Sequence, residues 1–281
     1  MIDPTEILNI SASIVLYNNS PALVEATIQS FLKLSFSKKK LYLIDNSPTD
    51  ALRMLASLSN DIEYVKTEAN LGFGKAHNLA LSRSLETAKY HVVLNPDIYF
   101  DKDVLERIYE YMEIHSDVAQ VMPKVCYPDG EIQRLCKLLP SPIDLFLRRF
   151  FSWMPGAEER NRQYELHDSG YNKIMNVPYL SGCFMFFRTS ALKEVGLFDE
   201  RIFMYIEDAD ITRRMHRKYK TLFFPDVFVY HHYAKGSYKS FKLMAYNLHG
   251  AFIYFNKYGW IFDAERRRVN AATIEAYLPK T

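Results

Sequence analysis

The first hundred residues alternate between short apolar runs and segments in which apolar residues recur every three or four positions. Apolar runs of strand length lie at 10–17, 41–44, 62–65 and 91–94. Helical spacing is found at 22–34, 51–58 and 75–84. Ser20 and Pro21 favour a helix start before the first of these segments, and Thr49 or Asp50 favours one before the second. Strands and helices in alternation predict a mostly parallel sheet with right-handed crossovers.

The second half of the chain has a different pattern. Strand-like runs lie at 119–126, 183–188 and 222–230, and the last predicts either a strand pair or one bent strand. Residues 207–218 predict a polar helix, and apolar residues at helical spacing return at 240–257. Residues 127–177 contain four prolines and little regular pattern, which is typical of a functional insertion or a flap. No linker is rich enough in Gly, Ser or Pro to separate two autonomous domains.

Composition and charge narrow the class of protein. A chain of 281 residues with 48 % apolar and 24 % charged content is ordinary for a globular protein. The charge of +2 gives no argument for a nucleic-acid partner, and none is expected. Three cysteines without a Cys-x-x-Cys pair argue against a disulfide framework or a zinc site. Asp3 and Glu6 argue against a signal peptide, and no apolar run approaches the ~18 residues of a membrane span. The expectation is a cytoplasmic protein, soluble or peripheral on the inner face of the cytoplasmic membrane.

The end of the fourth predicted strand carries the most informative motif. Residues 92–94 form an apolar run that stops at Asn95-Pro96-Asp97, because proline removes a backbone donor. The Asn95 amide and the Asp97 carboxylate then lie at the carboxyl edge of the sheet, where open α/β folds bind ligands. Their hard oxygen atoms suit Mg²⁺ or Mn²⁺ carrying a phosphate-bearing substrate. A strand followed by an Asx turn is the alternative.

Two further motifs belong to the same half. Asp45 follows the second strand, where its carboxylate suits a base N–H or a ribose hydroxyl, or else a helix-capping turn. A loop with Gly72 and Gly74 runs into the third helix, which permits close backbone approach and favours anions. The third glycine of a dinucleotide fingerprint is missing, so a plain turn with a solvated Lys75 is the alternative to phosphate binding.

The second half offers candidate acceptor-side and acid–base groups. Ser181 and Gly182 precede a dense apolar strand, where the glycine either admits an acceptor or only begins the strand. Glu207, Asp208 and Asp210 open a helix after an aromatic run. Carboxylates in the first turn complement the helix dipole, and one of them in a cleft would serve as a general base for a hydroxyl nucleophile.

Two more segments have open interpretations. His231 and His232 close a strand, where a histidine would ligate a metal, bind a diphosphate or simply pack. Residues 145–154 mix aromatic side chains with Arg148 and Arg149. Such a segment either rests in a membrane interface with its arginines at lipid phosphates, or folds as a flap onto the protein.

Taken in order, these pieces resemble the family-2 glycosyltransferases, and most of all bacterial rhamnosyltransferases that build O-antigen or capsule polysaccharide. The resemblance is carried by Ile14–Asn18, Ile44–Ser47, Asn70–Gly74 with Asn78, Asn95–Asp97, Ser181–Phe184, and Phe198–Glu200 through Glu207–Asp210 with Arg214. It implies a GT-A fold of the α/β class: a Rossmann-like, mostly parallel central sheet flanked by helices, with a long acceptor-side insertion and C-terminal helices. It also implies a glycosyltransferase domain over 1–238, divided at about residue 100 into nucleotide-sugar and acceptor halves, and a helical extension over 239–281.

The resemblance implies roles for residues. Asp208 would be the catalytic base, with Glu207 the second candidate. Asp97 would ligate Mg²⁺ or Mn²⁺, with His231 as metal or diphosphate ligand and His232 as the alternative. Arg214 would hold the helix or a carboxylate. The donor side would comprise Tyr17, Asn18, Asp45, which would bind the base, Asn70, Gly72, Phe73, Gly74, Lys75, Asn78 and Asn95. The acceptor side would comprise Ser181, Gly182 and Tyr205.

One departure from the family pattern concerns the metal. Asn95 stands where many relatives have the first aspartate of Asp-x-Asp, which removes one negative charge from the expected site.

The expected reaction is inverting transfer of a sugar from a nucleotide-diphosphate donor to a surface-polysaccharide acceptor linked to undecaprenyl diphosphate. The best donor is dTDP-L-rhamnose, and galactofuranosyl or N-acetylhexosaminyl transfer is the alternative. Two rivals come from other classes. A nucleotide-cofactor oxidoreductase would need a fuller glycine fingerprint after the first strand, where Tyr17-Asn18-Asn19-Ser20 stands instead. A non-catalytic sugar-binding module would not need the pair Asp97 and Asp208.

Overall fold

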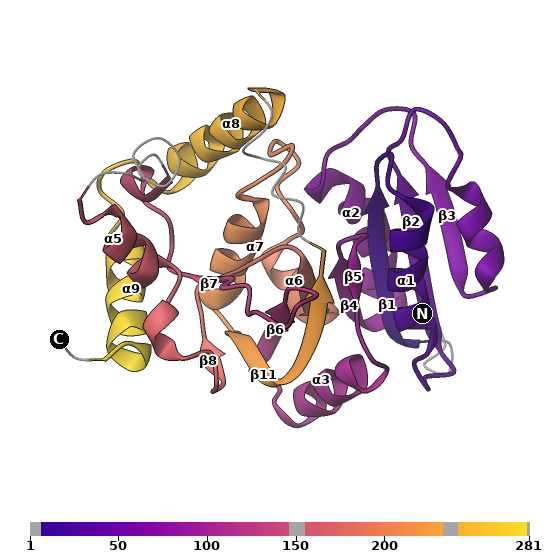
Figure 1. The fold of residues 1–281 in the computed structure, drawn as a ribbon, viewed down its shortest axis with the longest axis horizontal. Helices are drawn as coiled ribbons and strands as arrows, with labels where there is room; N and C mark the ends of the chain where they lie inside the picture. The colour runs from indigo at the N-terminus through magenta and orange to yellow at the C-terminus, as the bar shows by residue number, and fades with distance from the viewer. Residues whose placement is uncertain (1–6, 146–154, 233–240, 280–281) are drawn as a thin grey trace.

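A computed structural model describes residues 7–145, 155–232 and 241–279 (Figure 1). Almost all of the aromatic and basic segment 145–154 and the expected domain boundary at 238 lie outside these residues. In Figure 1 the N-terminal strand β1 lies in the right-hand half of the molecule, and α9, near the C-terminus, lies on the left.

The expected alternation in the first half is confirmed. Its elements are β1 (Leu8–Leu16), α1 (Pro21–Leu32), β2 (Lys39–Asp45), η2 (Arg53–Leu58), β3 (Ile62–Lys66), α2 (Gly74–Thr87) and β4 (Ala88–Leu94). β1 pairs in parallel with both β2 and β4, and β2 pairs in parallel with β3. These connections put the ends of β1, β2 and β4 at one edge of the sheet.

The second half continues the same sheet. Its first elements are β5 (Ile98–Tyr99), α3 (Asp103–Ile114), β6 (Val118–Cys126), β7 (Cys136–Lys137), α5 (Ala157–Tyr164), η3 (His167–Ser169), β8 (Met175–Asn176) and β9 (Tyr179–Leu180). The remaining elements are β10 (Phe184–Arg188), α6 (Thr189–Val195), α7 (Glu207–His216), β11 (Lys220–His231), α8 (Phe241–Tyr258) and α9 (Ala264–Tyr277). The strand order is β3-β2-β1-β4-β10-β6-β11-β5, with β8 beside β11. β10 runs antiparallel between β4 and β6, whereas β6 and β11 are parallel. Together with the parallel pairs of the first half, this confirms the mostly parallel sheet.

The fold has three layers, with helices on both faces of the central sheet. Successive side chains of a strand point to opposite faces, so each strand packs on both helix layers. Val92 and Leu94 of β4 pack on one face with α1 and α3. Val93, between them, packs on the other face with α2, α6 and α7. The strands are therefore buried on both faces, as expected for a parallel sheet covered by helices.

The structure corrects several local predictions. Residues 51–58 form no α-helix but turns and the 3₁₀ helix η2. The Ser20 side chain makes no capping hydrogen bond at α1. The alternatives at 222–230 resolve to one strand, β11, with an irregularity between Phe224 and Phe228 where Pro225 interrupts its pairing. The described part of the long irregular segment, 127–177, contains α5, η3 and the two short strands β7 and β8. α3 was missed, although Val104, Leu105, Ile108 and Met112 have the spacing of its buried face.

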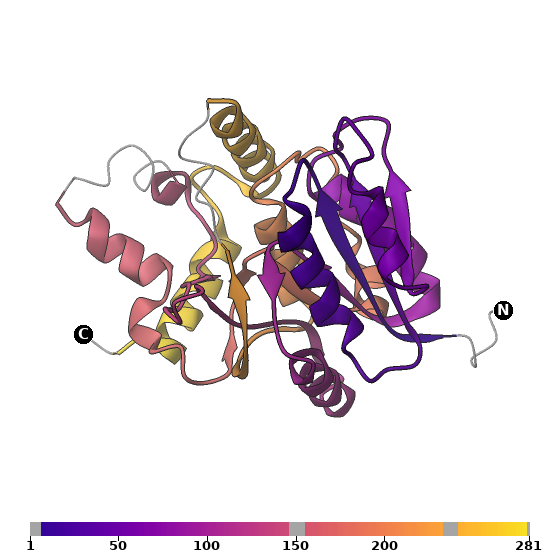
Figure 2. The ribbon, with the colours of Figure 1, turned by 45° about the vertical axis from the view of Figure 1, so that its right-hand side comes forward.

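The C-terminal helices expected from the resemblance are present as α8 and α9. α8 packs its Tyr254 and Phe255 against Tyr179 and Ala209, which belong to β9 and α7. In Figures 1 and 2, α8 lies along the upper edge of the molecule and α3 along the lower edge. Among the described residues, no helix is long and apolar enough to cross a bilayer.

Candidate active site

A cleft of about 800 Å³ opens at the carboxyl edge of the sheet, between the loop after β4 and the start of α7. The expected site residues that line it are Phe73, Asn95, Asp97, Ser181, Gly182, Tyr205, Glu207, Asp208 and His231. Asp97 and Asp208, more than a hundred positions apart in sequence, thus border one cavity. This shared cavity is the spatial condition for a two-substrate reaction.

Asp97 and His231 form one wall of the cleft. Nε2 of His231 lies 3.3 Å from Oδ1 of Asp97 and 3.3 Å from Nδ2 of Asn95. β5 and β11 bring them together, because His231 pairs with Ile98. His232 has its ring against Tyr99, 5.3 Å between centroids, and it is exposed. Of the two histidines, His231 is therefore the one whose ring faces the Asp97 carboxylate.

The ring of His231 is oriented by Gln133, a buried residue from the irregular segment. Nε2 of Gln133 donates to the carbonyl oxygens of His231, at 2.9 Å, and Cys126, at 3.4 Å. The amide oxygen of Gln133 therefore faces Nδ1 of His231, at 2.9 Å, and that nitrogen must carry a proton. Nε2 is then the ring nitrogen that faces Asp97. A histidine held in this way is typical of metal ligands.

The residues on this wall fit a divalent metal that is completed by substrate. The described residues contain no group of three or more His, Cys, Asp or Glu side chains placed to hold a metal. Asp97 and His231 offer two ligand atoms, Oδ1 and Nε2, which lie 3.3 Å apart. Mg²⁺ is commonly held by one or two carboxylates together with substrate phosphates, so a small protein ligand set is sufficient.

The opposite wall carries Asp208, which is half-buried at the first turn of α7. Its Oδ2 accepts from the backbone N–H of Gly182 at 2.9 Å, and its Oδ1 accepts from the backbone N–H of Ala209 at 2.9 Å. A Cβ on Gly182 would lie 3.2 Å from Cβ of Asp208. The glycine therefore admits the close approach of this carboxylate to the strand entry before β10.

Glu207 lines the same cleft in a different environment. Its side chain is buried, and Oε2 has no hydrogen-bond partner among the residues that the structure describes. Burial, and after it the charge of Asp208, raise the pKa of the Glu207 carboxyl well above its ordinary value. Burial and the neighbouring charge of Asp208 therefore favour the neutral, protonated form of Glu207.

Strained backbone leads into α7. Tyr205 and Ile206 have φ angles of 71° and 70°, a region that bulky and β-branched residues rarely adopt. Each such residue costs on the order of 1–3 kcal/mol and persists where its surroundings hold it. Gly250 of α8 supplies part of that hold, because a Cβ there would lie 2.7 Å from the carbonyl oxygen of Tyr205. α8 thus packs directly against the entrance to the acidic helix.

Arg214 holds α7 to its neighbours, as expected. Its Nε donates to Oδ2 of buried Asp210 at 2.9 Å, one helical turn away. Its other nitrogens donate to the carbonyl oxygens of Val195, Gly196 and Leu197. Asp210 also accepts from Lys257 and Tyr258 of α8.

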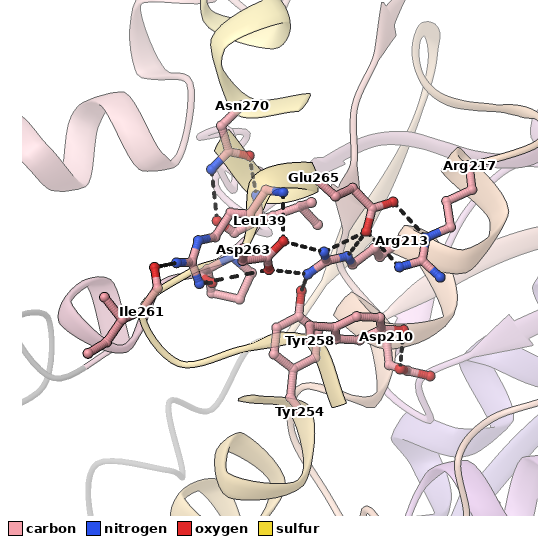
Figure 3. Close-up of polar contacts among 12 residues, drawn as sticks. Leu139, Asp210, Arg213, Arg217, Tyr254, Tyr258, Ile261, Asp263, Glu265 and Asn270 are labelled. Atoms are coloured by element: carbon pink, nitrogen blue, oxygen red, sulfur yellow. Dashed lines mark hydrogen bonds and ion pairs between the residues drawn. The ribbon is translucent and has the colours of Figure 1, made fainter. Parts of the chain in front are cut away.

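A buried cluster around Arg213 joins α7 to α8 and α9 (Figure 3). Arg213 donates to both carboxylate oxygens of Asp263 at 2.8 Å, to Glu265 and to the Tyr254 hydroxyl. Its guanidinium carbon lies 3.9 Å from the centroid of the Tyr258 ring. The carboxylates and hydroxyl raise the pKa of Arg213 although burial opposes the charge. The C-terminal helices therefore fix the helix that carries Asp208.

The glycine loop has a structural explanation. Gly72 has a φ of 80°, and a Cβ there would lie 2.1 Å from the carbonyl oxygen of Phe203. A Cβ on Gly74 would lie 2.8 Å from Cβ of Phe198. Both residues approached, Phe203 through its backbone and Phe198 through its side chain, belong to the loop before α7. Asn78 pairs with the backbone N–H and C=O of Phe198 at 3.1 and 2.9 Å.

The other residues expected on the donor side do not line this cleft. Asp45 is fully buried and accepts from the Tyr64 hydroxyl at 2.6 Å and the Ser47 N–H at 2.8 Å. Tyr17 is half-exposed beside Asn18, whose N–H donates to Ser47. Two more of the expected donor-side residues belong to the glycine loop and the start of α2. The Asn70 side chain accepts from the Gly72 N–H, and Lys75 forms an ion pair with Glu200.

Several residues of the cleft carried no signal in the sequence. They include Gln133, Arg134, Lys137, Tyr164 and Tyr179. The first four lie in the segment whose pattern is irregular, and Tyr179 lies in a strand of two residues. Irregular chain has no periodicity from which the direction of a side chain can be inferred. Only its length indicated a functional role.

The sheet topology, with a carboxylate and a histidine facing a helix-borne carboxylate across one cleft, defines a GT-A glycosyltransferase. The chain belongs to glycosyltransferase family 2, whose family model, "Glycosyl transferase family 2", matches residues 11–196. The expectation from the sequence motifs is therefore confirmed for the family, the fold and the enzyme class.

Two similar proteins are rhamnosyltransferases. N-acetylglucosaminyl-diphospho-decaprenol L-rhamnosyltransferase of Mycobacterium tuberculosis is 28 % identical over 245 residues, which cover 82 % of this chain and 77 % of the relative. Rhamnosyltransferase WbbL of Escherichia coli K12 is 26 % identical over 215 residues, 75 % of this chain and 78 % of that protein.

Solved structures share the fold at low identity. GalNAc-T7 with UDP, GalNAc and Mn²⁺ superposes with a TM-score of 0.62 at 15 % identity, over 90 % of this chain and 50 % of that chain. S. aureus TarS superposes with a TM-score of 0.59 at 17 % identity, over 95 % of this chain and 43 % of that chain. The chain thus spans half or less of the length of these two structures, and the likeness concerns the fold alone.

Proposed function

We propose that this enzyme transfers a sugar, with inversion, from a nucleotide-diphosphate donor to an acceptor linked to a polyprenyl diphosphate. L-rhamnose from dTDP-rhamnose is the proposed donor sugar, because two relatives are rhamnosyltransferases. The observation that carries the proposal is that Asp97 and Asp208 border one cleft of about 800 Å³. Such a volume is in the range of ligand pockets and suits a sugar with its diphosphate.

Asp208 is the proposed base. It removes the proton of an acceptor hydroxyl while that oxygen forms a bond to the anomeric carbon of the donor. The bond from that carbon to the diphosphate oxygen breaks, and the nucleoside diphosphate leaves with the electron pair. A single displacement inverts the anomeric centre. The two backbone N–H groups that hold the Asp208 carboxylate set its direction toward the cleft.

Asp97 and His231 would hold Mg²⁺ or Mn²⁺, and the bound metal supplies positive charge beside the leaving diphosphate. Asn95 would position His231 and the donor. Tyr17, Asn18, Asp45 and the loop from Asn70 to Asn78 remain the proposed nucleotide side, in the half from residue 10 to residue 100.

The acceptor would lie on the side of Ser181, Gly182 and Tyr205. Arg134 also lines the cleft and is exposed, so its guanidinium suits the diphosphate of a lipid-linked acceptor. An undecaprenyl diphosphate carrier places the enzyme at the inner face of the cytoplasmic membrane. In this proposal residues 1–238 form the glycosyltransferase domain and residues 239–281 the helical extension.

The matched variants Asp208→Asn and Glu207→Gln test the assignment of the base. Asp208→Asn is expected to keep donor binding by calorimetry and to lower kcat by roughly two orders of magnitude or more, the scale of general-base catalysis. Glu207→Gln replaces a neutral acid by an isosteric amide and is expected to cost less than about tenfold. Normal turnover of the Asp208 variant would show that the base is another group.

The donor and the stereochemistry need their own measurement. Wild-type enzyme is incubated with a short-chain GlcNAc diphosphate acceptor, Mn²⁺ and each of dTDP-rhamnose, a galactofuranosyl donor and an N-acetylhexosaminyl donor. The expected product is a rhamnoside whose anomeric configuration, by NMR, is opposite to that of the donor. Transfer of another sugar would overturn the donor, and retention would overturn the single displacement.

A further inference from the structure

The outer face of α8 is apolar where a surface helix is normally polar. Its exposed stripe consists of Phe241, Ala245, Leu248 and Phe252, spaced at four, three and four residues. The opposite stripe, with Gly250, Ala251, Tyr254 and Phe255, is buried against the protein. The helix is therefore apolar on two sides, and only one side has a partner among the described residues.

The loop after α8 extends this surface with Trp260, Ile261 and Phe262. The Ile261 and Phe262 side chains are 74 % and 82 % exposed. The ring of Trp260 lies 5.8 Å from that of Phe252, which makes the loop and the helix one continuous surface. This surface, comprising Phe241, Leu248, Phe252, Trp260, Ile261 and Phe262, is called the α8 surface below.

The loop holds these side chains outward by its backbone. Gly259 has a φ of 105°, and a Cβ there would lie 2.6 Å from the carbonyl oxygen of Phe262. Nη2 of Arg266 donates to the carbonyl oxygen of Ile261 at 3.3 Å. Asp263 caps α9 by accepting from the backbone N–H of Arg266 at 2.9 Å. These contacts define the turn that keeps the side chains of Ile261 and Phe262 exposed.

The charged residues of segment 241–262, which carries the α8 surface, are all basic. Residues 241–262 contain no Asp or Glu, and Lys242 and His249 flank the exposed stripe. Arg267 and Arg268 of α9 are exposed, and the Arg267 guanidinium lies 5.9 Å from the centre of the Phe262 ring. Aromatic side chains with neighbouring cations suit the boundary between acyl chains and anionic headgroups.

We propose that the α8 surface is the membrane-docking surface of this enzyme, with Phe252, Ile261 and Phe262 inserted among the headgroups of an anionic bilayer. The occupant is a lipid surface, because the patch combines exposed aromatic groups with cations and lacks acidic residues. The cations would contact lipid phosphates while the apolar side chains enter the acyl boundary.

The position of α8 links this surface to the reaction. Asn247, on another side of the same helix, lines the active-site cleft, and Gly250 packs on the carbonyl oxygen of Tyr205. In this respect the inference rests on the proposed function: an acceptor whose lipid lies in the bilayer would reach the cleft along α8. The docking surface itself requires no particular acceptor.

The test is flotation of the full chain with vesicles of phosphatidylglycerol and phosphatidylcholine, compared with phosphatidylcholine alone. The variant Ile261→Ser/Phe262→Ser is expected to weaken partition onto the anionic vesicles by at least about tenfold. The control Met54→Ser/Ile114→Ser removes two side chains that are 64 % and 79 % exposed and is expected to bind as wild type. Ile114 ends α3, on the edge opposite α8 in Figures 1 and 2.

Phe241→Ser, at a side chain 87 % exposed, provides a second variant if the loop variant melts early. Unchanged partition of both variants, or equal loss in the control, would overturn the proposal. A wild type that is a dimer, is split by the loop variant and does not bind vesicles would assign the surface to self-association instead.

Transfer to the short-chain soluble acceptor separates this proposal from the proposed function. The loop variant is expected to keep that activity and to lose transfer to a polyprenyl acceptor in vesicles. Absence of transfer to either acceptor in the wild type would contradict the proposed function, whereas the flotation result would still decide the docking surface.

Discussion

The backbone N–H of Gly182 donates to Oδ2 of Asp208 at 2.9 Å, across 26 positions of sequence. This contact joins the strand entry before β10 to the acidic start of α7, two motifs that the sequence presents separately. It also explains why the residue before Cys183 is a glycine. A side chain there would meet the carboxylate that it now orients.

Gly182→Ala is expected to lower kcat by roughly ten- to a hundredfold, the scale of a sub-ångström to 1 Å misplacement of a catalytic group. The new Cβ would lie 3.2 Å from Cβ of Asp208 and 3.5 Å from the ring of Phe73, so Asp208 must shift by a few tenths of an ångström. Steady-state kinetics measures the effect, with donor affinity and melting temperature as controls. A variant with wild-type kcat would contradict a positioning role for this N–H group.

Gln133→Leu is expected to weaken metal-dependent binding of dTDP by roughly 10- to 100-fold, the usual effect of removing a group that orients a ligand histidine. Leucine cannot accept from Nδ1 of His231, so the ring loses the hydrogen bond at 2.9 Å that fixes its tautomer. Calorimetric titration of dTDP at increasing Mn²⁺ measures the change. Equal Mn²⁺ dependence in variant and wild type would remove His231 from the proposed metal site.

Asp263→Ala is expected to lower the free energy of unfolding by about 3–5 kcal/mol, because it leaves the buried Arg213 guanidinium without its two-pronged partner. The loss of the cap on Arg266 adds to the effect. Urea denaturation measures it. The control Glu86→Ala breaks an exposed ion pair with Lys193 and is expected to cost less than about 1 kcal/mol. Similar losses in both variants would show that the cluster around Arg213 adds no special stability.

Acid is expected to destabilise the protein through two buried histidines, His77 of α2 and His91 of β4, whose rings both bond to Ser13 of β1. Burial lowers the pKa of His91 from its ordinary 6.5 to about 3, and it also lowers the pKa of His77. At a pH between about 3 and 6.5, the His91 imidazole binds a proton in the unfolded chain but not in the folded chain. Its contribution to stability is thus fully present above pH 6.5 and is lost as the pH falls toward 3.

His91→Gln is expected to flatten the dependence of stability on pH by about 1.4 kcal/mol per pH unit within that window. His91 bonds to Ser11, Ser13 and Ser84, so the variant also loses stability at neutral pH, but the slope is measured separately. Urea denaturation at a series of pH values gives the slope, with His249→Gln, at an exposed position of α8, as the control. An unchanged slope would assign acid sensitivity to other groups.

The sequence predicted much of the fold because periodicity is a local property. The strands ending at Leu16, Asp45 and Leu94 are apolar runs bounded by turn residues, and the structure has them within a few residues of the predicted ends. η2 was predicted as α-helix because spacing alone does not separate a 3₁₀ turn from a short helix. α3 was missed although its pattern was present.

The sequence by itself determined the alternating α/β architecture and the order of the motifs, and that order identifies the family. Only the tertiary structure decided which carboxylate meets Gly182, that Gln133 orients His231, and that Gly72 makes room for Phe203. These contacts join residues that lie far apart in sequence, and their partners depend on how whole elements pack. An apolar pattern shows that a helix has an apolar face. Whether that face packs on the core or remains exposed, as on α8, depends on how the other helices and strands pack.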